Sequence, residues 1–264
     1  MHRLLHLLAR KIRTVWATIV ACRNWPSILL YKFGAPISVE TLELRNGMRI
    51  RPIPPLRKTW GEIFEPAIAD VYDIRKCQPD FIVDVGANIG AFACLAAHTH
   101  PQATVHAFEP SQQHADKLAE NATLNGLNNI VLHRKAVTKD GRDAVFTVLE
   151  GGGSSGLFLH EAGRSSLIES VSLDCLDFSK SRFLFLKLDC EGAEGEIIEW
   201  VCANQEKLPP NVRIACEYHQ WCPLTSDAIL QSLHKCGFDA QQRIIFDECY
   251  LFASLGSTSA IDRN

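Results

Sequence analysis

The stretch that decides the fold is Val83-Asp84-Val85-Gly86-Ala87-Asn88-Ile89-Gly90-Ala91-Phe92. An apolar run from Phe81 to Val85 leads into it, and an apolar segment with helical spacing follows it. Gly86 and Gly90 mark a tight turn between the two. The pattern predicts a strand, a loop and a helix N-terminus. Such a junction offers free backbone N–H groups and lets a ligand approach the main chain closely.

An acidic residue stands at the end of the next expected strand. Glu109 follows His106-Ala107-Phe108 and lies 23 residues after Gly86. One strand–helix–strand step of this length brings an acid within reach of a ribose diol. A dinucleotide fingerprint would need a glycine where Asn88 stands, because that glycine lets the backbone approach a pyrophosphate. The spacing Asp84-x-Gly86-x-x-x-Gly90 therefore disfavours a nicotinamide site.

This spacing resembles the first motif of class I S-adenosylmethionine-dependent methyltransferases, and a second block narrows the resemblance. Phe185-Leu186-Lys187-Leu188-Asp189-Cys190-Glu191-Gly192-Ala193-Glu194 is similar to the L-K-x-D-x-E-G-A-E block of the FkbM methyltransferase family. Further matching pieces occur in the family's order: Trp60 to Phe64 with Tyr72, Gly86 to Gly90, Phe108-Glu109-Pro110, Asn121 with Leu124-Asn125, Gly151 to Ser155, and Leu173-Asp174.

The resemblance implies a Rossmann-like O-methyltransferase that uses S-adenosylmethionine. In that family the acceptor is usually a hydroxyl of a sugar, a polysaccharide or glycolipid, or a polyketide-like natural product. The resemblance also implies that the first acid lies near the amino-acid part of the cofactor, the loop beneath its ribose, and the second acid at the ribose hydroxyls. The expected cofactor-binding residues are Asp84, Gly86, Asn88, Gly90, Glu109, Ala136 and Val137.

Composition indicates one folded domain and argues against nucleic acid as a partner. The chain has 264 residues, of which 47% are hydrophobic, and a net charge of −3. A basic run with interleaved aromatic residues does not occur after residue 60. The ten cysteines are scattered without a C-x-x-C pair, which predicts a reducing compartment and a cytoplasmic protein. The expected partner is a small-molecule or glycan acceptor, and the oligomeric state stays open.

Strand-like and helix-like segments alternate after a break at Pro52, Pro54 and Pro55. This alternation predicts an α/β fold with a doubly wound, mostly parallel seven-stranded sheet and helices on both faces. A helix and a small hairpin around Asn46-Gly47 are expected before it. The expected helices cover 60–75, 88–98 and 112–125, and the expected strands 81–85, 104–109, 130–134, 144–149, 170–173, 183–188, 212–217, 240–246 and 250–252. The run Gly151–Gly156 is either a surface loop or a mobile wall over the site.

Residues 1–35 are interpreted as a helical segment ahead of a methyltransferase domain at 36–264. Apolar residues recur at helical spacing from Leu4 to Val20, with Arg3, Arg10 and Arg13 on the other side. Three readings compete: a helix docked on the domain, a basic amphipathic helix on an anionic membrane surface, and a cleaved signal. The apolar stretch is shorter than the ~20 residues of a spanning helix.

The candidates for chemistry are His219, Asp189 and Glu191, near the ends of two expected strands where open α/β sheets bind ligands. Methylation of an alcohol requires the oxygen to be aligned and its proton removed. An imidazole with a near-neutral pKa suits the base role. Structural readings compete, since His219 also fits a hydrogen-bonded structural role and Glu191 and Glu194 fit helix capping. No metal site is assigned, and a divalent ion held by Asp189, Glu217 and His219 is the alternative.

Two other functions fit parts of the same pattern. One is a nicotinamide-dependent oxidoreductase of the same fold class, disfavoured by Asn88 at the fingerprint position. The other is a catalytically silent, membrane-associated module that binds the cofactor. Methylation of nucleic acid is disfavoured, because the chain has no N/D-P-P-Y/F motif.

Overall fold

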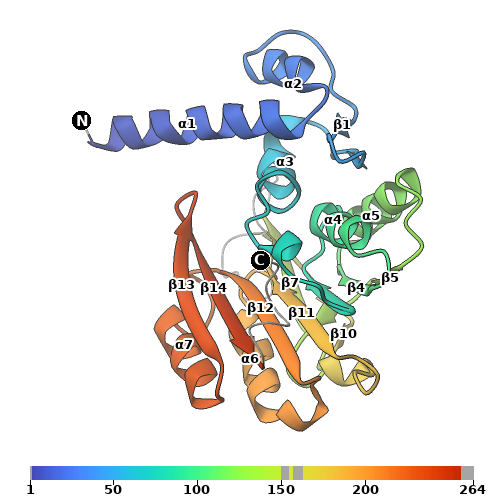
Figure 1. The fold of residues 1–264 in the computed structure, drawn as a ribbon, viewed down its shortest axis with the longest axis vertical. Coiled ribbons are helices and arrows are strands. Elements are labelled where there is room, and N and C mark those ends of the chain that lie inside the picture. The colour runs from blue at the N-terminus through green and yellow to red at the C-terminus, as the bar shows by residue number, and fades with distance from the viewer. Residues whose placement is uncertain (1, 150–154, 157–162, 257–264) are drawn as a thin grey trace.

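A computed structural model describes residues 2–149, 155–156 and 163–256 (Figure 1). Its centre is a seven-stranded sheet in the order β13-β14-β12-β11-β3-β4-β5. Neighbouring strands from β12 to β5 are parallel, whereas β14 is antiparallel to both β12 and β13. The predicted mostly parallel seven-stranded sheet is confirmed. Its strands are β3 (Phe81–Val85), β4 (Thr104–Phe108), β5 (Ile130–His133), β11 (Phe183–Leu188), β12 (Asn211–Tyr218), β13 (Asp239–Ile245) and β14 (Glu248–Leu255).

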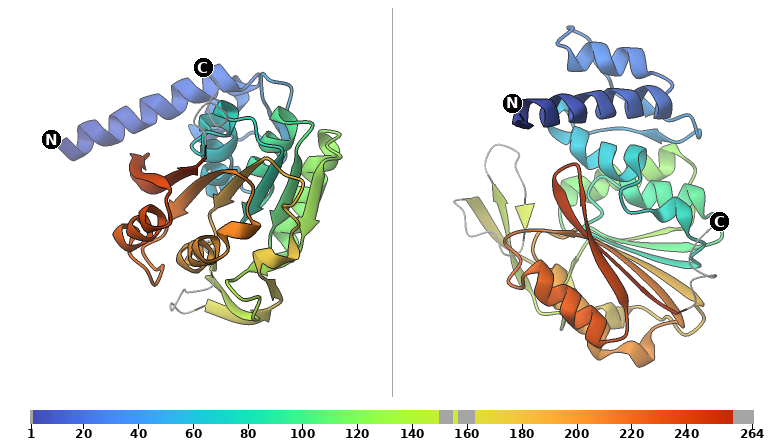
Figure 2. Two further views of the ribbon diagram at one scale, coloured as in Figure 1. Left: turned by 60° about the horizontal axis from the view of Figure 1, so that its bottom comes forward. Right: turned by 60° about the vertical axis from the view of Figure 1, so that its left-hand side comes forward.

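Helices cover both faces of this sheet. Strand β11 shows why, because all six of its residues are buried and successive side chains point to opposite faces. Phe183 and Phe185 pack in the core cluster that includes α4 (Ala91–Thr99) and α5 (Gln112–Leu124). Leu184 and Leu186 pack in a second cluster with α6 (Glu194–Ala203) and α7 (Ser226–Lys235). Figure 2 shows the two helix layers on either side of the twisted sheet.

The N-terminal part contains α1 (His2–Ala21), α2 (Trp25–Lys32) and the hairpin of β1 (Leu42–Glu43) and β2 (Arg49–Ile50). The predicted helix and the predicted hairpin are confirmed. The N-terminal end of α1 projects away from the sheet (Figure 1, Figure 2). Its C-terminal end is anchored, since Cys22 pairs with Leu44 of the hairpin and is fully buried in the same core cluster as α4. The division between residues 35 and 36 stays a prediction.

The helix expected over 60–75 is wrong in its bounds. Helix α3 spans Leu56–Ile63, the π-helix η1 spans Phe64–Ala69, and Asp70 ends the run with a left-handed φ of 52°. Pro66 lies inside η1, and its missing N–H prevents a regular α-helical hydrogen bond there. A separate 3₁₀ turn, η2 (Ile74–Lys76), precedes β3.

Smaller differences concern the segments outside the main sheet. Helix α4 begins at Ala91 rather than at residue 88, because Asn88 and Gly90 have positive φ. The strand expected over 170–173 is only β10 (Ser170–Val171), which pairs with β6 (Ala136–Val137) and is followed by the 3₁₀ turn η3 (Leu173–Cys175). Of the predicted loop Gly151–Gly156, residues 151–154 lie outside the described residues. The remaining elements are β7 (Ala144–Leu149), β8 (Ser155–Gly156), β9 (Gly163–Ile168) and η4 (Gln205–Lys207).

Candidate active site

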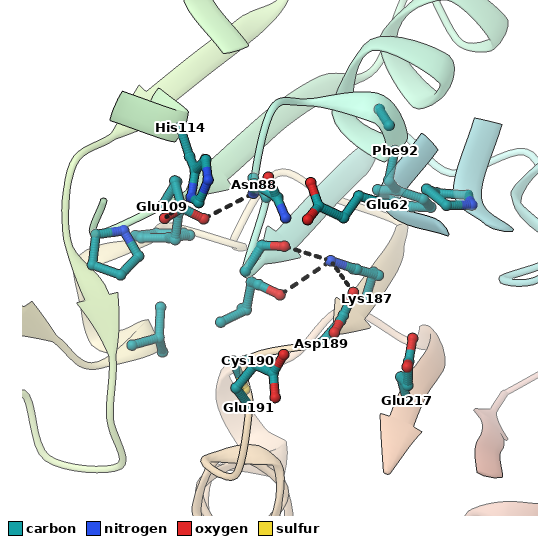
Figure 3. A pocket seen from close by; sticks show the side chains of 18 of the residues that line it. Glu62, Asn88, Phe92, Glu109, His114, Lys187, Asp189, Cys190, Glu191 and Glu217 are labelled. Carbon is teal, nitrogen blue, oxygen red and sulfur yellow. Dashed lines mark hydrogen bonds and ion pairs between the residues drawn. The ribbon is translucent and has the colours of Figure 1, made fainter. Parts of the chain in front are cut away.

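A cavity of about 430 Å³ lies at the carboxyl ends of β3, β4, β11 and β12 (Figure 3). Its volume is in the range of sites for cofactors and drug-sized ligands. It is lined by most of the predicted site residues: Gly86, Asn88, Glu109, Ala136, Val137, Asp189, Glu191 and His219. The topology therefore gathers in one place residues that are spread over more than half of the chain.

The loop after β3 needs glycine at its first position. Gly86 has a φ of +76°, and a Cβ placed there would lie 1.8 Å from the carbonyl oxygen of Asp189. The N–H groups of Gly86 and Ala87 both donate to the carbonyl of Phe108, at 3.0 and 2.9 Å. The loop is thus pressed between the ends of β4 and β11, and its backbone forms one wall of the cavity.

Gly90 has a different role from the one predicted. It is not among the residues that line the cavity. Its φ is +83°, and a Cβ there would lie 2.6 Å from Cγ of Leu118 on α5. Gly90 therefore permits α4 to begin in close contact with α5, and any effect on a ligand is indirect.

Glu109 is held with its carboxylate at the cavity. Its Oε2 accepts from the Asn88 N–H and its Oε1 from the Ser111 N–H, both at 2.8 Å. Each oxygen keeps a lone pair for a further donor, as a ribose diol would require. Burial raises the pKa of Glu109 to about 7, although the two backbone N–H groups act in the opposite direction. Burial raises the pKa of Glu62, another residue of the cavity wall, and the Asn88 side chain acts in the opposite direction.

Asp84 is the predicted cofactor ligand that the structure does not support. Its side chain is fully buried and does not line the cavity. It pairs instead with Lys187, whose Nζ lies 2.9 Å from Asp84 Oδ1 and 2.7 Å from the carbonyl oxygen of Gly86. Asp84 therefore acts on the cavity through Lys187, which ties the glycine loop to β11. Burial raises the pKa of Asp84, against the opposing charge of Lys187.

Two tyrosines join three carboxylates along the cavity wall. The Tyr72 hydroxyl lies 3.0 Å from both Asp189 Oδ2 and Glu217 Oε2. The Tyr250 hydroxyl lies 3.0 Å from Glu65 Oε2 and 3.2 Å from Glu217 Oε2. Each tyrosine has one proton for two carboxylates. Burial and the charge of Asp189 raise the pKa of Glu217 to about 8, so Glu217 is largely protonated at neutral pH and can donate to a tyrosine oxygen.

His219 is surrounded by acids and is positively charged. Its Nδ1 lies 2.8 Å from Glu194 Oε1. Its Nε2 lies 3.5 Å from Glu191 Oε2, 3.8 Å from Asp189 Oδ1 and 3.9 Å from Glu217 Oε1. Burial lowers the pKa of His219, but the hydrogen bond and charge of Glu194 and the charges of Glu191 and Asp189 outweigh it and raise the pKa to about 10. The expected near-neutral imidazole is therefore wrong.

Asp189 keeps its negative charge in this setting. Burial alone would raise the pKa of Asp189, but the charges of Lys187 and His219 outweigh burial and hold it below its usual value. The contacts of Tyr72 and Lys187 go to Oδ2, and Oδ1 faces His219. Asp189 thus presents one ionised oxygen toward His219.

Glu194 fastens the loop after β11. It is fully buried, and its carboxylate accepts from the N–H groups of Cys190, at 3.2 Å, and Gly192, at 2.9 Å. Glu191 lies between them with a left-handed φ of 58°. The capping alternative therefore applies to Glu194, which organises both this loop and His219. The sequence patterns indicated no site role for Tyr72, Lys187, Glu194 or Glu62, although all four fall within the segments that carry the family resemblance.

Acidic residues outnumber basic ones on the cavity wall, which holds Glu62, Glu65, Glu109, Asp189, Glu191 and Glu217 against Lys135, Lys187, His114 and His219. Like charges brought together in a buried site favour a ligand that carries positive charge. A phosphate-containing dinucleotide would not offset this charge.

The sequence profile described as "Methyltransferase FkbM domain" matches residues 84–240. This chain belongs to the FkbM methyltransferase family. The family is one of methyltransferases, whose methyl donor is S-adenosylmethionine. The alternative of a nicotinamide-dependent oxidoreductase does not agree with this membership.

Individual relatives match shorter parts of the chain. The 31-O-demethyl-FK506 methyltransferase FkbM of Streptomyces tacrolimicus is 37% identical over 86 residues, which cover 32% of this chain and 33% of that protein. Methyltransferase 1 of Beauveria bassiana (strain ARSEF 2860) is 26% identical over 111 residues, 41% of this chain and 45% of that protein. The chain thus matches less than half the length of either relative. The solved structure of M. jannaschii TYW2 in complex with AdoMet aligns with a TM-score of 0.46 at 12% identity, covering 86% of this chain and 89% of that one.

The residues of the cavity fit this cofactor. S-adenosylmethionine carries a sulfonium and an ammonium group, which suit a cavity whose wall has more acidic than basic side chains. Glu109 offers anchored acceptor oxygens of the kind that ribose hydroxyls need. Gly86 has no side chain, so a ligand can contact its backbone at the cavity wall. Ala136 and Val137 line the cavity with apolar side chains of the kind that adenine requires.

Proposed function

We propose that the protein transfers a methyl group from S-adenosylmethionine to a hydroxyl of a sugar, a polysaccharide or glycolipid, or a polyketide-like natural product. The observation that carries the proposal is the cluster of Asp189, Glu191, Glu217 and His219 in the same cavity as the glycine loop and Glu109. An alcohol must give up its proton as it is methylated, so its methyltransferase needs a proton acceptor beside the reacting oxygen.

Asp189 is the residue that best suits the proton acceptor. Its Oδ1 is not engaged by Tyr72 or Lys187, and the carboxylate is ionised. His219, as an imidazolium, is suited to donate a hydrogen bond that orients the acceptor oxygen and not to take its proton. Glu191 lies beside both and helps to hold the charge of His219.

The cofactor supplies an activated methyl group with a good leaving group. The chain's own part is to hold the donor and the acceptor in line. Glu109, Asn88 and the backbone at Gly86 are proposed to hold the ribose, and Ala136 and Val137 the adenine. One relative supports a hydroxyl acceptor, since it is named for methylation of 31-O-demethyl-FK506.

The proposal is tested by incubating the protein with ¹³C-methyl-labelled cofactor and a panel of glycans, glycolipids and macrolides. A new ¹³C methyl-ether signal on one acceptor is the expected result. A label found only on nitrogen or carbon of the accepted compound would overturn the assignment to oxygen.

The same assay tests the cluster. His219→Ala and Asp189→Asn should each lower turnover by roughly 10²–10⁴, because a proton acceptor or its partner acts only during transfer. Cofactor affinity in both variants should stay within a few-fold of the parent. Parental turnover in Asp189→Asn would remove Asp189 from the reaction.

We also propose that α1 binds an anionic membrane surface from the cytoplasmic side. Ile12, Trp16 and Val20 recur every four residues on α1 and are 60%, 67% and 53% exposed. Before Glu40 the chain has six lysines and arginines and neither aspartate nor glutamate, although its total charge is −3. An apolar stripe on a basic helix suits anionic lipid headgroups. Among the described residues, no helix is long and apolar enough to cross a bilayer.

Vesicle sedimentation tests this contact on the full chain. Binding to vesicles that contain phosphatidylserine should weaken as salt rises and in Trp16→Gln. Leu167→Gln removes an equally exposed apolar side chain, 70% exposed on β9, and should bind as the parent does. Equal binding of Trp16→Gln and the parent, or equal binding to neutral vesicles, would favour a helix docked only on its own domain.

A further inference from the structure

Asp189 and Glu217 each turn one carboxylate oxygen toward the ring of His219. Tyr72 contacts Asp189 and Glu217 through Oδ2 and Oε2, whereas the other oxygens, Oδ1 and Oε1, face Nε2 of His219. The donor atoms of Asp189, Glu217 and His219 all lie within 4.8 Å of one another. Figure 3 shows Asp189 and Glu217 at the ends of neighbouring strands, with Glu191 on the loop after β11.

The distances are too long for direct hydrogen bonds and suit a shared ion. His219 Nε2 lies 3.5 to 3.9 Å from one oxygen each of Glu191, Asp189 and Glu217. Donor atoms bound to one ion at about 2.1 Å are separated by about 3 to 4 Å. The His219 side chain is only 9% exposed, and within the described part of the chain its Nε2 makes no hydrogen bond. A buried ring nitrogen is thus aimed at the centre of the cluster.

The other ring nitrogen is arranged as metal-binding histidines usually are. Nδ1 of His219 contacts the fully buried Glu194 at 2.8 Å, and Glu194 is itself held by the N–H groups of Cys190 and Gly192. A carboxylate on the far nitrogen fixes the ring and directs Nε2 toward a metal. Tyr72 and Tyr250 similarly hold the far oxygen of Glu217. Lys187 contacts Asp189 at Oδ2, away from the oxygen that faces Nε2.

From this geometry we propose that Asp189, Glu217 and His219 bind one divalent transition-metal ion, with Glu191 beside it. The ion displaces the proton from His219 Nε2 and the proton from Glu217, and both are released to solvent. One imidazole nitrogen and two carboxylate oxygens form a donor set that suits Mn²⁺ or Zn²⁺, whereas Mg²⁺ and Ca²⁺ prefer oxygen alone. Three protein ligands leave open positions that an acceptor hydroxyl can fill. The link to catalysis rests on the proposed function: an ion there takes the place of the His219 imidazolium, because it orients the acceptor oxygen and stabilises negative charge on it. Binding itself does not depend on the acceptor.

The test measures Mn²⁺ binding by calorimetry and electron paramagnetic resonance, with neither cofactor nor acceptor present. The parent should bind one Mn²⁺ per chain, and Mg²⁺ should compete weakly. Glu217→Gln and His219→Gln should each weaken Mn²⁺ binding by roughly 10- to 100-fold. Glu62→Gln is the matched control, because Glu62 is an acid of the same cavity outside the cluster, and it should bind Mn²⁺ within about twofold of the parent.

Circular dichroism melting shows that each variant is folded before its affinity is compared. If the parent protein binds Mn²⁺ but methylates no oxygen in the ¹³C assay, the proposed function is contradicted and the metal site is not. The absence of saturable Mn²⁺ binding up to about 1 mM would overturn the metal site. Equal weakening in Glu217→Gln and Glu62→Gln would also overturn it, since that result would reflect general charge in the cavity.

Discussion

Glu109 joins two properties that the cofactor pocket needs. The sequence places Glu109 directly after the last residue of β4. Its carboxylate accepts hydrogen bonds from the N–H groups of Asn88 and Ser111, which fix its position. It is only 5% exposed, so a group that it binds loses little to competing water. A hydrogen bond between a hydroxyl and a buried carboxylate is stronger than one between neutral groups.

We expect Glu109→Ala to weaken the binding of S-adenosylmethionine by about 1.5–3 kcal/mol, which is roughly tenfold to 150-fold. The loss reflects hydrogen bonds from the ribose diol to a charged acceptor. Calorimetry measures it directly. Glu120→Ala, at an exposed glutamate of α5, is the control and should bind as the parent does. Unchanged affinity in Glu109→Ala would place the ribose elsewhere.

The raised pKa of Glu109 predicts a pH dependence of cofactor binding. The carboxylate form accepts two hydroxyl hydrogen bonds, and it is the minor form below a pKa of about 7. Affinity should therefore rise by about tenfold between pH 6 and pH 8. Titration of S-adenosylhomocysteine binding across this range measures the effect, and Glu109→Gln should remove most of it. A flat profile in the parent would contradict the assigned pKa shift.

At the scale of elements, the loop between β3 and α4 is a rigid contact between three strand ends. Gly86 lies against the backbone of Asp189, and Lys187 ties the same loop to β11 through the Gly86 carbonyl. A Cβ at position 86 would collide with backbone atoms of Asp189, which cannot move aside as a flexible side chain could. The loop that forms one wall of the cavity and the end of β11 that leads to Asp189 are therefore positioned together.

We expect Gly86→Ala to destabilise the fold by at least about 2 kcal/mol and to abolish measurable cofactor binding. The cause is a Cβ 1.8 Å from the Asp189 carbonyl oxygen, combined with a φ of +76°. Thermal denaturation and calorimetry measure the two effects. Gly61→Ala is the control, because a Cβ on that α3 residue meets nothing within 4 Å, and it should leave the melting temperature equal or higher. Parental stability in Gly86→Ala would show that the loop can move away from β11.

At the scale of the whole molecule, the active site stores unfavourable charge in the core of the fold. His219 is charged because four acids from β11, β12 and the segments after them surround it. Stability therefore depends on the protonation of a site whose members come from distant parts of the chain. A cationic cofactor is expected to relieve part of this cost.

The sign of the His219 shift sets a dependence of stability on pH. Its pKa is about 10 in the folded protein, against 6.5 for an unperturbed histidine. The stabilisation is therefore complete below pH 6.5 and is lost as the pH rises to 10. With EDTA present, the free energy of unfolding should fall more steeply between pH 7 and pH 10 in the parent than in His219→Gln. Parallel curves from urea denaturation would show that His219 is not charged in the folded state.

Much of the fold was predictable because its signals are local. Three examples are the apolar run of β11, the glycine turn after β3 and the Asn46-Gly47 hairpin. The residues that form each of these signals lie within a short stretch of the sequence. Errors arose where one residue overrode the pattern. Pro66 turned a predicted helix into a π-helix, and the positive φ of Asn88 and Gly90 delayed the start of α4.

By itself, the sequence determined the parallel sheet, the glycine loop, Glu109 at a strand end and the acidic block after β11, because hydrophobic periodicity and turn chemistry act between neighbours. The tertiary structure decided that Asp84 serves Lys187 and that Gly90 serves helix packing. It also decided that Tyr72 meets Asp189 across 117 residues of chain and that His219 carries a charge. Burial and electrostatic interaction depend on distance in space, and folding alone sets that distance for residues far apart in the chain.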